Sequence, residues 1–262
     1  METKTKPKVE KPKEVYSFDE VNHIHKFGDK PLMGVTTVLS VISKPALIQW
    51  SASIAADYIE KELRENCMKV TEGGGEEILV DGESLNITCK EAKVAHRVKK
   101  ETAGDFGTIL HTAIENYIKT GEAPEDLSFE GLQGFVKFMF WANKEKVKFL
   151  ESEKHVWSKE LWVGGICDGI LTLDGKKYLF DVKTSSGIYP TMFAQMAAYH
   201  LCLKEMKEHE DIAGYLIVNL NKQGKMDLAM SNNMDFNQTF FKNALALYKS
   251  NQEADKMKLV KE

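Results

Sequence analysis

The chain has 262 residues, enough to bury the core of one large domain or two small ones. Apolar residues make up 43% of it and charged residues 28%, and the net charge of -4 excludes a protein whose overall charge draws it to nucleic acid. The four cysteines are scattered without a C-x-x-C pair, which argues against a disulfide framework or a zinc site. No apolar run is long enough for a membrane span, so we expect a cytoplasmic protein with no membrane partner.

The N-terminal region changes character after its first residues. Residues 1–14 hold five lysines and two prolines, which predicts a disordered basic tail. Residues 15–41 are typical of short strands around turns. His23 and His25 share one face of a strand there, but no further ligands lie at a spacing that suits zinc. Pro45 then starts a predicted helix to about residue 65, and we expect this helix to bury apolar side chains at helical spacing, among them Leu47 and Ile48.

The next segment predicts an insertion and two helices. Residues 71–88 are glycine-rich, and Asp81-Gly82 predicts a hairpin turn. A basic helix follows from Lys90, whose lysines either face solvent or contact phosphate. A second helix follows Gly104, with Asp105 or Thr108 as its N-cap. His111 and Glu115 are four residues apart and share a face of that helix.

The middle of the chain predicts a helix and then strands. The helix spans about 132–150 and combines core aromatics with Lys137, Lys144 and Lys146. A strand over 151–157 carries Glu153. We expect one domain over 15–250, with an insertion at about 66–90 and a polar tail at 251–262.

The segment 164–185 concentrates the acidic residues. Asp174-Gly175 between apolar runs predicts a two-residue hairpin turn in which Leu173 faces Lys176. This register places Asp168 opposite Asp181, and Lys183 leaves the same face. Opposed carboxylates destabilise a strand pair unless they are compensated. A Mg²⁺ ion held by oxygen ligands is one compensation, and a solvent-exposed hairpin with Lys183 paired to Asp181 is the other.

The remaining elements complete an α/β pattern. Pro190 precedes a helix over 191–209, on which Gln195 and Tyr199 lie one turn apart. An apolar strand over 214–219, a turn at 221–224, another strand and a helix over 236–248 follow. The order predicts a mixed sheet flanked by helices.

Several of these motifs occur in an order that resembles the PD-(D/E)XK nuclease superfamily. They are Gly165-x-x-Asp168, Asp181-Val182-Lys183 and Gln195-x-x-x-Tyr199, with Gly107-Thr108-x-x-His111 upstream. The resemblance is to the RecB-like branch, which includes phage exonucleases and the mitochondrial genome maintenance exonuclease. The segment 35–39 followed by Trp50 also resembles the N-terminal part of phage nucleases of this branch. The proline usual before the first aspartate is replaced here by Cys167.

The resemblance implies a restriction-endonuclease-like core with N-terminal helical additions and an Mg²⁺ or Mn²⁺ cofactor. The implied metal ligands are His111, Glu153, Asp168, Asp181 and the backbone carbonyl of Val182. Lys183 would act on water and phosphate, while Gln195 and Tyr199 would position the DNA backbone. The implied function is an exonuclease on DNA in phage or bacterial recombination and repair. The scattered cysteines argue against the iron–sulfur cluster of some relatives.

Three alternatives stay open at this point. The chain could be a DNA-binding module of the same fold without activity, or an RNA-directed or structure-selective endonuclease, because the motifs specify phosphodiester chemistry and not the polymer. It could also be a carboxylate metalloenzyme acting on small molecules. The sequence does not specify the oligomeric state.

Overall fold

The structure is a computed structural model that describes residues 15–72 and 75–257. It divides into two compact units, which are described separately. The first unit consists of the described residues up to Ile42 and from Ala113 onward, and the second of Ser43–Thr112. The predicted basic tail, 1–14, lies outside the described residues, and the predicted insertion, 66–90, lies within the second unit.

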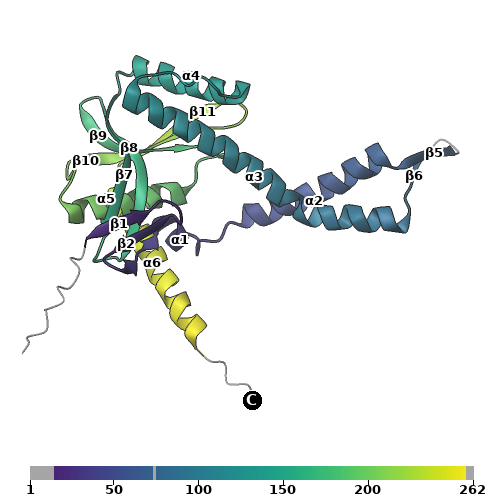
Figure 1. Ribbon diagram of the computed structural model, residues 1–262, viewed down its shortest axis with the longest axis horizontal. Helices are drawn as coiled ribbons and strands as arrows, with labels where there is room; N and C mark the ends of the chain where they lie inside the picture. The colour runs from purple at the N-terminus through teal and green to yellow at the C-terminus, as the bar shows by residue number, and fades with distance from the viewer. Residues whose placement is uncertain (1–14, 73–74, 258–262) are drawn as a thin grey trace, which may run out of the picture. The chain divides into compact units, whose positions relative to one another are not determined.

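The first unit is built on a six-stranded mixed sheet with the strand order β11-β10-β9-β8-β4, in which β7 also pairs with β8 (Figure 1). Its strands are β4 (Met33–Gly34), β7 (Lys148–Ser158), β8 (Val163–Leu173), β9 (Lys176–Lys183), β10 (Ile212–Leu220) and β11 (Met226–Ser231). The pairs β9/β10 and β4/β8 are parallel and the others are antiparallel. A parallel pair needs a crossover connection, and helix α5 (Pro190–Met206) supplies it between β9 and β10.

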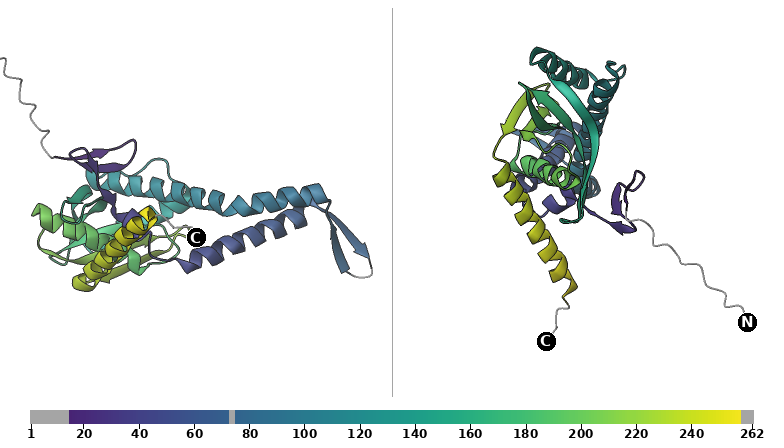
Figure 2. Two further views of the ribbon diagram at one scale, coloured as in Figure 1. Left: turned by 90° about the horizontal axis from the view of Figure 1, so that it is seen from below. Right: turned by 90° about the vertical axis from the view of Figure 1, so that its left-hand side faces the viewer.

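Helices cover both faces of this sheet (Figure 2). Successive residues of a strand point to opposite faces, so neighbouring residues of β9 pack against different helices. On one face, Leu179 of β9 packs in a core with α5, α6 (Met234–Lys256) and α1 (Val35–Leu39). On the other face, the ring of Phe180 contacts Phe149, which stacks on Phe138 of α4 (Phe129–Lys144). The first unit is therefore an α/β fold with a mixed sheet flanked by helices, as predicted from the order of elements.

A small antiparallel sheet precedes this core. Its strands are β1 (Tyr16–Asp19), β2 (Ile24–Phe27) and β3 (Lys30–Pro31). The hydroxyl of Tyr16 makes hydrogen bonds with Nδ1 of His25 at 2.8 Å and Nδ1 of His155 at 3.0 Å. His25 is therefore a buried hydrogen-bonding residue, and burial lowers its pKa to about 4.

The second unit contains two helices and a hairpin. The helices are α2 (Pro45–Asn66) and the first part of α3 (Gly82–Thr120), joined by β5 (Met68–Glu72) and β6 (Gly75–Leu79). The hydroxyl of Tyr58 donates to Glu91 at 2.8 Å between the helices. The helix from Pro45 is confirmed, but the predicted burial of Leu47 and Ile48 is wrong, since both are exposed.

Other elements differ from the sequence-based predictions in identifiable ways. Asp81 does not form the hairpin turn. Its carboxylate accepts hydrogen bonds from the backbone of Glu83 and Ser84 and starts α3. Gly104 does not interrupt α3, because a glycine costs only about 1 kcal/mol in a helix that is otherwise well formed. The segment Val35–Leu39 is the helix α1 and not a strand.

The last helix is longer than predicted. It continues to Lys256, so the segment expected as a polar tail from 251 begins as helix. Asn233 caps it, since the side-chain oxygen accepts from the backbone N–H of Phe236 at 3.2 Å. Across the described ranges, no helix combines the length and apolar character that crossing a bilayer requires.

Candidate functional site

The hairpin of β8 and β9 has the register that the sequence predicts. Leu173 pairs with Lys176, and the pairing continues to Gly169 and Phe180. Asp174 has φ 50° and Gly175 has φ 72°, so both turn residues adopt the left-handed conformation of a two-residue hairpin turn. One further step along both strands from Gly169 and Phe180 reaches Asp168 and Asp181.

Asp168 is fixed to β9 by its carboxylate and not by the backbone ladder. Its Oδ2 accepts a hydrogen bond of 2.7 Å from the backbone N–H of Val182. Burial raises the pKa of Asp168, the charge of Lys183 and the Val182 hydrogen bond lower it, and Glu115 raises it further. The predicted convergence of Asp168 with the Asp181–Lys183 segment is present, whereas the role of the Val182 carbonyl as a ligand stays a prediction.

Asp181 and Lys183 form an ion pair in which the aspartate is buried and the lysine is 23% exposed. Nζ of Lys183 lies 2.5 Å from Oδ2 of Asp181, whose side chain is only 2% exposed. Burial alone would lower the pKa of Lys183, but the charges of Asp181 and Asp168 outweigh burial and raise it. The lysine is therefore a cation at neutral pH, held between two carboxylates.

Glu153 brings a third carboxyl group to these strands. The pairs Ser152–Gly169 and Lys154–Cys167 of β7 and β8 enclose Glu153 and Asp168. Burial, followed by the charges of Glu115 and Asp168, raises the pKa of Glu153 to about 7. Glu153 also has φ 52° inside a strand, a left-handed conformation that costs a non-glycine residue about 1–3 kcal/mol. Backbone strain of this kind concentrates at functional sites.

Tyr199 and Gln195 reach the same region from α5. Nε2 of Gln195 donates to the hydroxyl of Tyr199 at 2.8 Å. The tyrosine is 4% exposed, and its ring lies where a side chain of Gly165 would be, since a Cβ there would be 2.4 Å from Cε1 of Tyr199. This contact gives a physical reason for the glycine of the Gly-x-x-Asp motif. Burial raises the pKa of Tyr199 well above 10, and the charges of Asp181 and Asp168 add to the shift.

The two predicted residues of α3 fall on different sides of the boundary between the units. Glu115 belongs to the first unit, is paired with Lys119, and acts electrostatically on both Glu153 and Asp168. The sequence left its role open. Its electrostatic effect now places it beside the three carboxylates of Glu153, Asp168 and Asp181, here called the acidic group. His111 belongs to the second unit, so its role as a metal ligand stays a prediction.

The donor chemistry of this region suits a hard divalent cation. Asp168, Asp181 and Glu153 offer carboxylate oxygens, which Mg²⁺ and Mn²⁺ prefer. Burial raises the pKa of Glu153 first and the charges of Glu115 and Asp168 raise it further, and a bound cation would favour the ionised carboxylate again. However, residues 15–72 and 75–257 contain no group of three or more His, Cys, Asp or Glu side chains already arranged to hold an ion. The residues fit a metal by chemistry and by charge, not by a preformed ligand shell.

Comparison with known proteins adds no argument about the fold or the function. The sequence matches no family profile and no curated protein. Among solved structures it is similar to one described as "Crystal structure of SSO0001", with 11% identity over 76% of this chain and 86% of that chain and a TM-score of 0.29. A likeness this weak carries no argument about function. The class that the structure defines is an α/β protein with a mixed sheet flanked by helices and a partly buried acidic group beside a lysine.

Proposed function

We propose that this protein is a metal-dependent deoxyribonuclease with a restriction-endonuclease-like core, acting on DNA ends as an exonuclease in recombination or repair. The observation that carries the proposal is the meeting of Asp168 with the Asp181–Lys183 ion pair at the end of a hairpin. A partly buried group of this composition is costly for stability, because each charge loses hydration. Perturbed carboxylates and a lysine in one place are typical of a functional site.

Asp168, Asp181 and Glu153 would hold the Mg²⁺ or Mn²⁺ ion. When bound, the ion supplies positive charge for the scissile phosphate and makes a coordinated water more acidic. His111 and the Val182 carbonyl are proposed as further ligands on the strength of the motif resemblance alone.

The protein's own residues would contribute charge and orientation. The ammonium group of Lys183 stabilises negative charge that develops on the phosphate, and its pairing with Asp181 holds it in place before substrate binds. The neutral hydroxyl of Tyr199, fixed by Gln195, offers a donor to a phosphate oxygen. Proximity and fixed donors lower the barrier because little reorganisation is needed during the reaction.

The test uses end-labelled linear DNA, end-labelled linear RNA and covalently closed circular DNA, each with Mg²⁺, Mn²⁺ or EDTA. We expect shortening of the linear DNA with either metal, no shortening with EDTA, and persistence of the circle. Asp181→Asn should reduce cleavage by at least about 100-fold, since removal of one charge-stabilising group commonly costs that much. Asp211→Asn is the matched control, because Asp211 is an exposed aspartate that also pairs with a lysine.

The outcomes separate the alternatives. Rapid nicking of the circle would replace the exonuclease by an endonuclease, and cleavage of RNA in place of DNA would change the substrate. Binding of DNA without cleavage under any metal condition would favour an inactive DNA-binding module. Near-normal cleavage by Asp181→Asn would refute the assignment of the site.

A further inference from the structure

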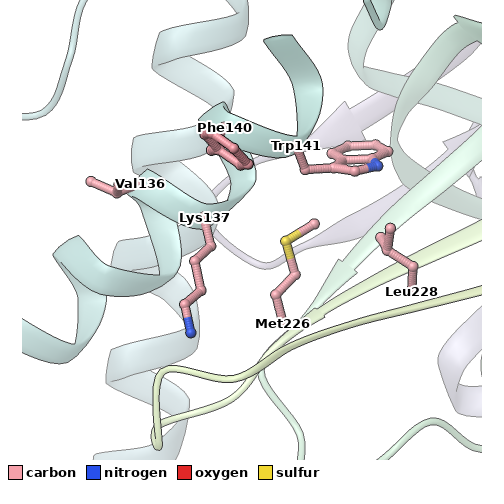
Figure 3. Close-up of a pocket in the computed structure, with 6 residues that line it drawn as sticks. All are labelled: Val136, Lys137, Phe140, Trp141, Met226 and Leu228. Atoms are coloured by element: carbon pink, nitrogen blue, oxygen red, sulfur yellow. The ribbon is translucent and has the colours of Figure 1, made fainter. Parts of the chain in front are cut away.

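An apolar groove lies on the first unit between α4 and the edge strand β11 (Figure 3). Its volume is about 350 Å³. It is lined by Val136, Lys137, Phe140, Trp141, Met226 and Leu228. The groove uses none of the residues of the acidic group, so the inference does not depend on the proposed nuclease activity.

The walls of the groove are apolar side chains that the fold leaves uncovered. Phe140 is 69% exposed and Leu228 is 45% exposed. Phe129, Leu132, Val136 and Phe140 recur at intervals of three and four residues along α4, and all four are exposed. These residues therefore form one apolar stripe, here called the α4 stripe, beside the buried face of the same helix. An apolar stripe of this kind is typical of an interaction surface.

The floor of the groove continues into an open sheet edge. Met226 pairs with Leu220 and Leu228 pairs with Val218, which leaves the other side of β11 without a partner strand in the described ranges. Sheet edges are usually protected by proline, bulges or several charges. The six residues of β11 contain no proline and only one charge, Asp227, and their pairing with β10 is continuous. The backbone groups on the open side can therefore pair with an added strand.

The charge at the groove is positive. Lys137 is the only charged residue among those that line it. Its ammonium group donates to the backbone carbonyl of Gly224, and it forms no ion pair with any acidic side chain in the described ranges. A carboxylate on the molecule that occupies the groove would form an ion pair with the ammonium group of Lys137. A second copy of the chain, docked through the same groove, would bring another Lys137 and no acidic lining residue.

We propose that this groove binds an extended segment of a partner protein, which adds a strand beside β11 and places an acidic side chain against Lys137. The partner's alternate apolar side chains pack under the α4 stripe, on the same face as Met226 and Leu228, because side chains of neighbouring strands share faces. Backbone hydrogen bonds to β11 supply the affinity, and the apolar and acidic positions supply the specificity.

The test measures the anisotropy of a fluorescein-labelled octapeptide, Thr-Val-Thr-Val-Thr-Glu-Thr-Val, whose valines and glutamate lie on one face of the added strand, added to the full chain in EDTA. We expect saturable binding, weaker binding of the peptide with lysine in place of glutamate, and loss of binding when a proline interrupts the strand. Phe140→Glu should abolish binding, whereas Phe236→Glu, at another exposed phenylalanine, on α6, should leave it unchanged. Lys137→Glu should shift the preference toward the lysine peptide by about two- to fivefold, the size of a surface ion pair.

Four results would overturn the proposal. They are failure of the acidic peptide to bind, a preference that Lys137→Glu leaves unchanged, a wild-type dimer that Phe140→Glu dissociates, and oligothymidylate binding at the groove that the peptide cannot displace. The dimer is measured by sedimentation equilibrium. Since the assay contains no metal and detects no cleavage, its failure leaves the nuclease proposal intact, and loss of nuclease activity leaves this one intact.

Discussion

Replacing Gly165 with alanine tests whether the motif glycine exists to admit the ring of Tyr199. An added Cβ would be 2.4 Å from Cε1 of that ring, about 1 Å closer than an ordinary contact, and the ring is buried. Overpacking of a core typically costs about 1–3 kcal/mol. We therefore expect Gly165→Ala to lower the free energy of unfolding by about 2 kcal/mol. Because the ring must move, the Gln195–Tyr199 hydrogen bond should also weaken.

The assay is urea unfolding followed by circular dichroism, with Gly187→Ala as the control. The Cβ added at Gly187 would have its nearest contact at 3.6 Å, to the hydroxyl of Tyr189, so this control should change stability little. The double variant Gly165→Ala with Tyr199→Leu should recover part of the loss, because leucine vacates the space that the ring occupies. Equal stability of Gly165→Ala and the wild type, or additive losses in the double variant, would refute the reasoning.

Three further predictions concern other parts of the chain. Gly104→Ala should slow amide hydrogen exchange around it in α3, because alanine is better in a helix by about 1 kcal/mol and an added Cβ meets nothing within 4 Å. Burial, followed by the charge of Lys204, lowers the pKa of His200 to about 4, so stability should fall as the pH drops from 6.5 toward 4. The loss at pH 5 should be about 2 kcal/mol, and His200→Gln should remove it in urea titrations, while an unchanged pH slope would contradict the assignment. In metal titrations of cleavage, His111→Ala should raise the midpoint more for Mg²⁺ than for Mn²⁺, whereas the defect of Lys183→Ala should persist at saturating metal; an unchanged midpoint would show that His111 is not a ligand.

The parts of the fold that the sequence predicts well are those with strong local signals. Asp174-Gly175 has one favoured hairpin geometry, and that geometry fixes the register which brings Asp168 close to Asp181. The alternation of strands and helices after residue 148 is similarly clear, because buried parallel strands are continuous apolar runs. These signals are short-range, so the hairpin and the order of elements after residue 148 could be predicted without knowledge of their distant contacts.

The errors arise where local and long-range preferences conflict. Gly104 is a helix breaker by local propensity, yet α3 continues through it. The apolar pattern of Leu47 and Ile48 predicts burial, but the second unit leaves both exposed. No local signal predicts the left-handed backbone of Glu153, which depends on how β7 meets β8. The electrostatic link of Glu115 to Asp168 likewise required the tertiary structure.

Under the proposed function, the unusual backbone of Glu153 places stability and nuclease activity in opposition at one position. Glycine adopts a φ of 52° without the steric penalty that glutamate incurs, and it would also remove a carboxyl group whose pKa of about 7 reflects burial beside other acids. A library of variants selected only for resistance to unfolding should therefore enrich glycine at 153. The same library selected for the reaction of the acidic group should keep glutamate. Residue 153 would then be a site where natural selection has retained a residue that the folded backbone, by itself, disfavours.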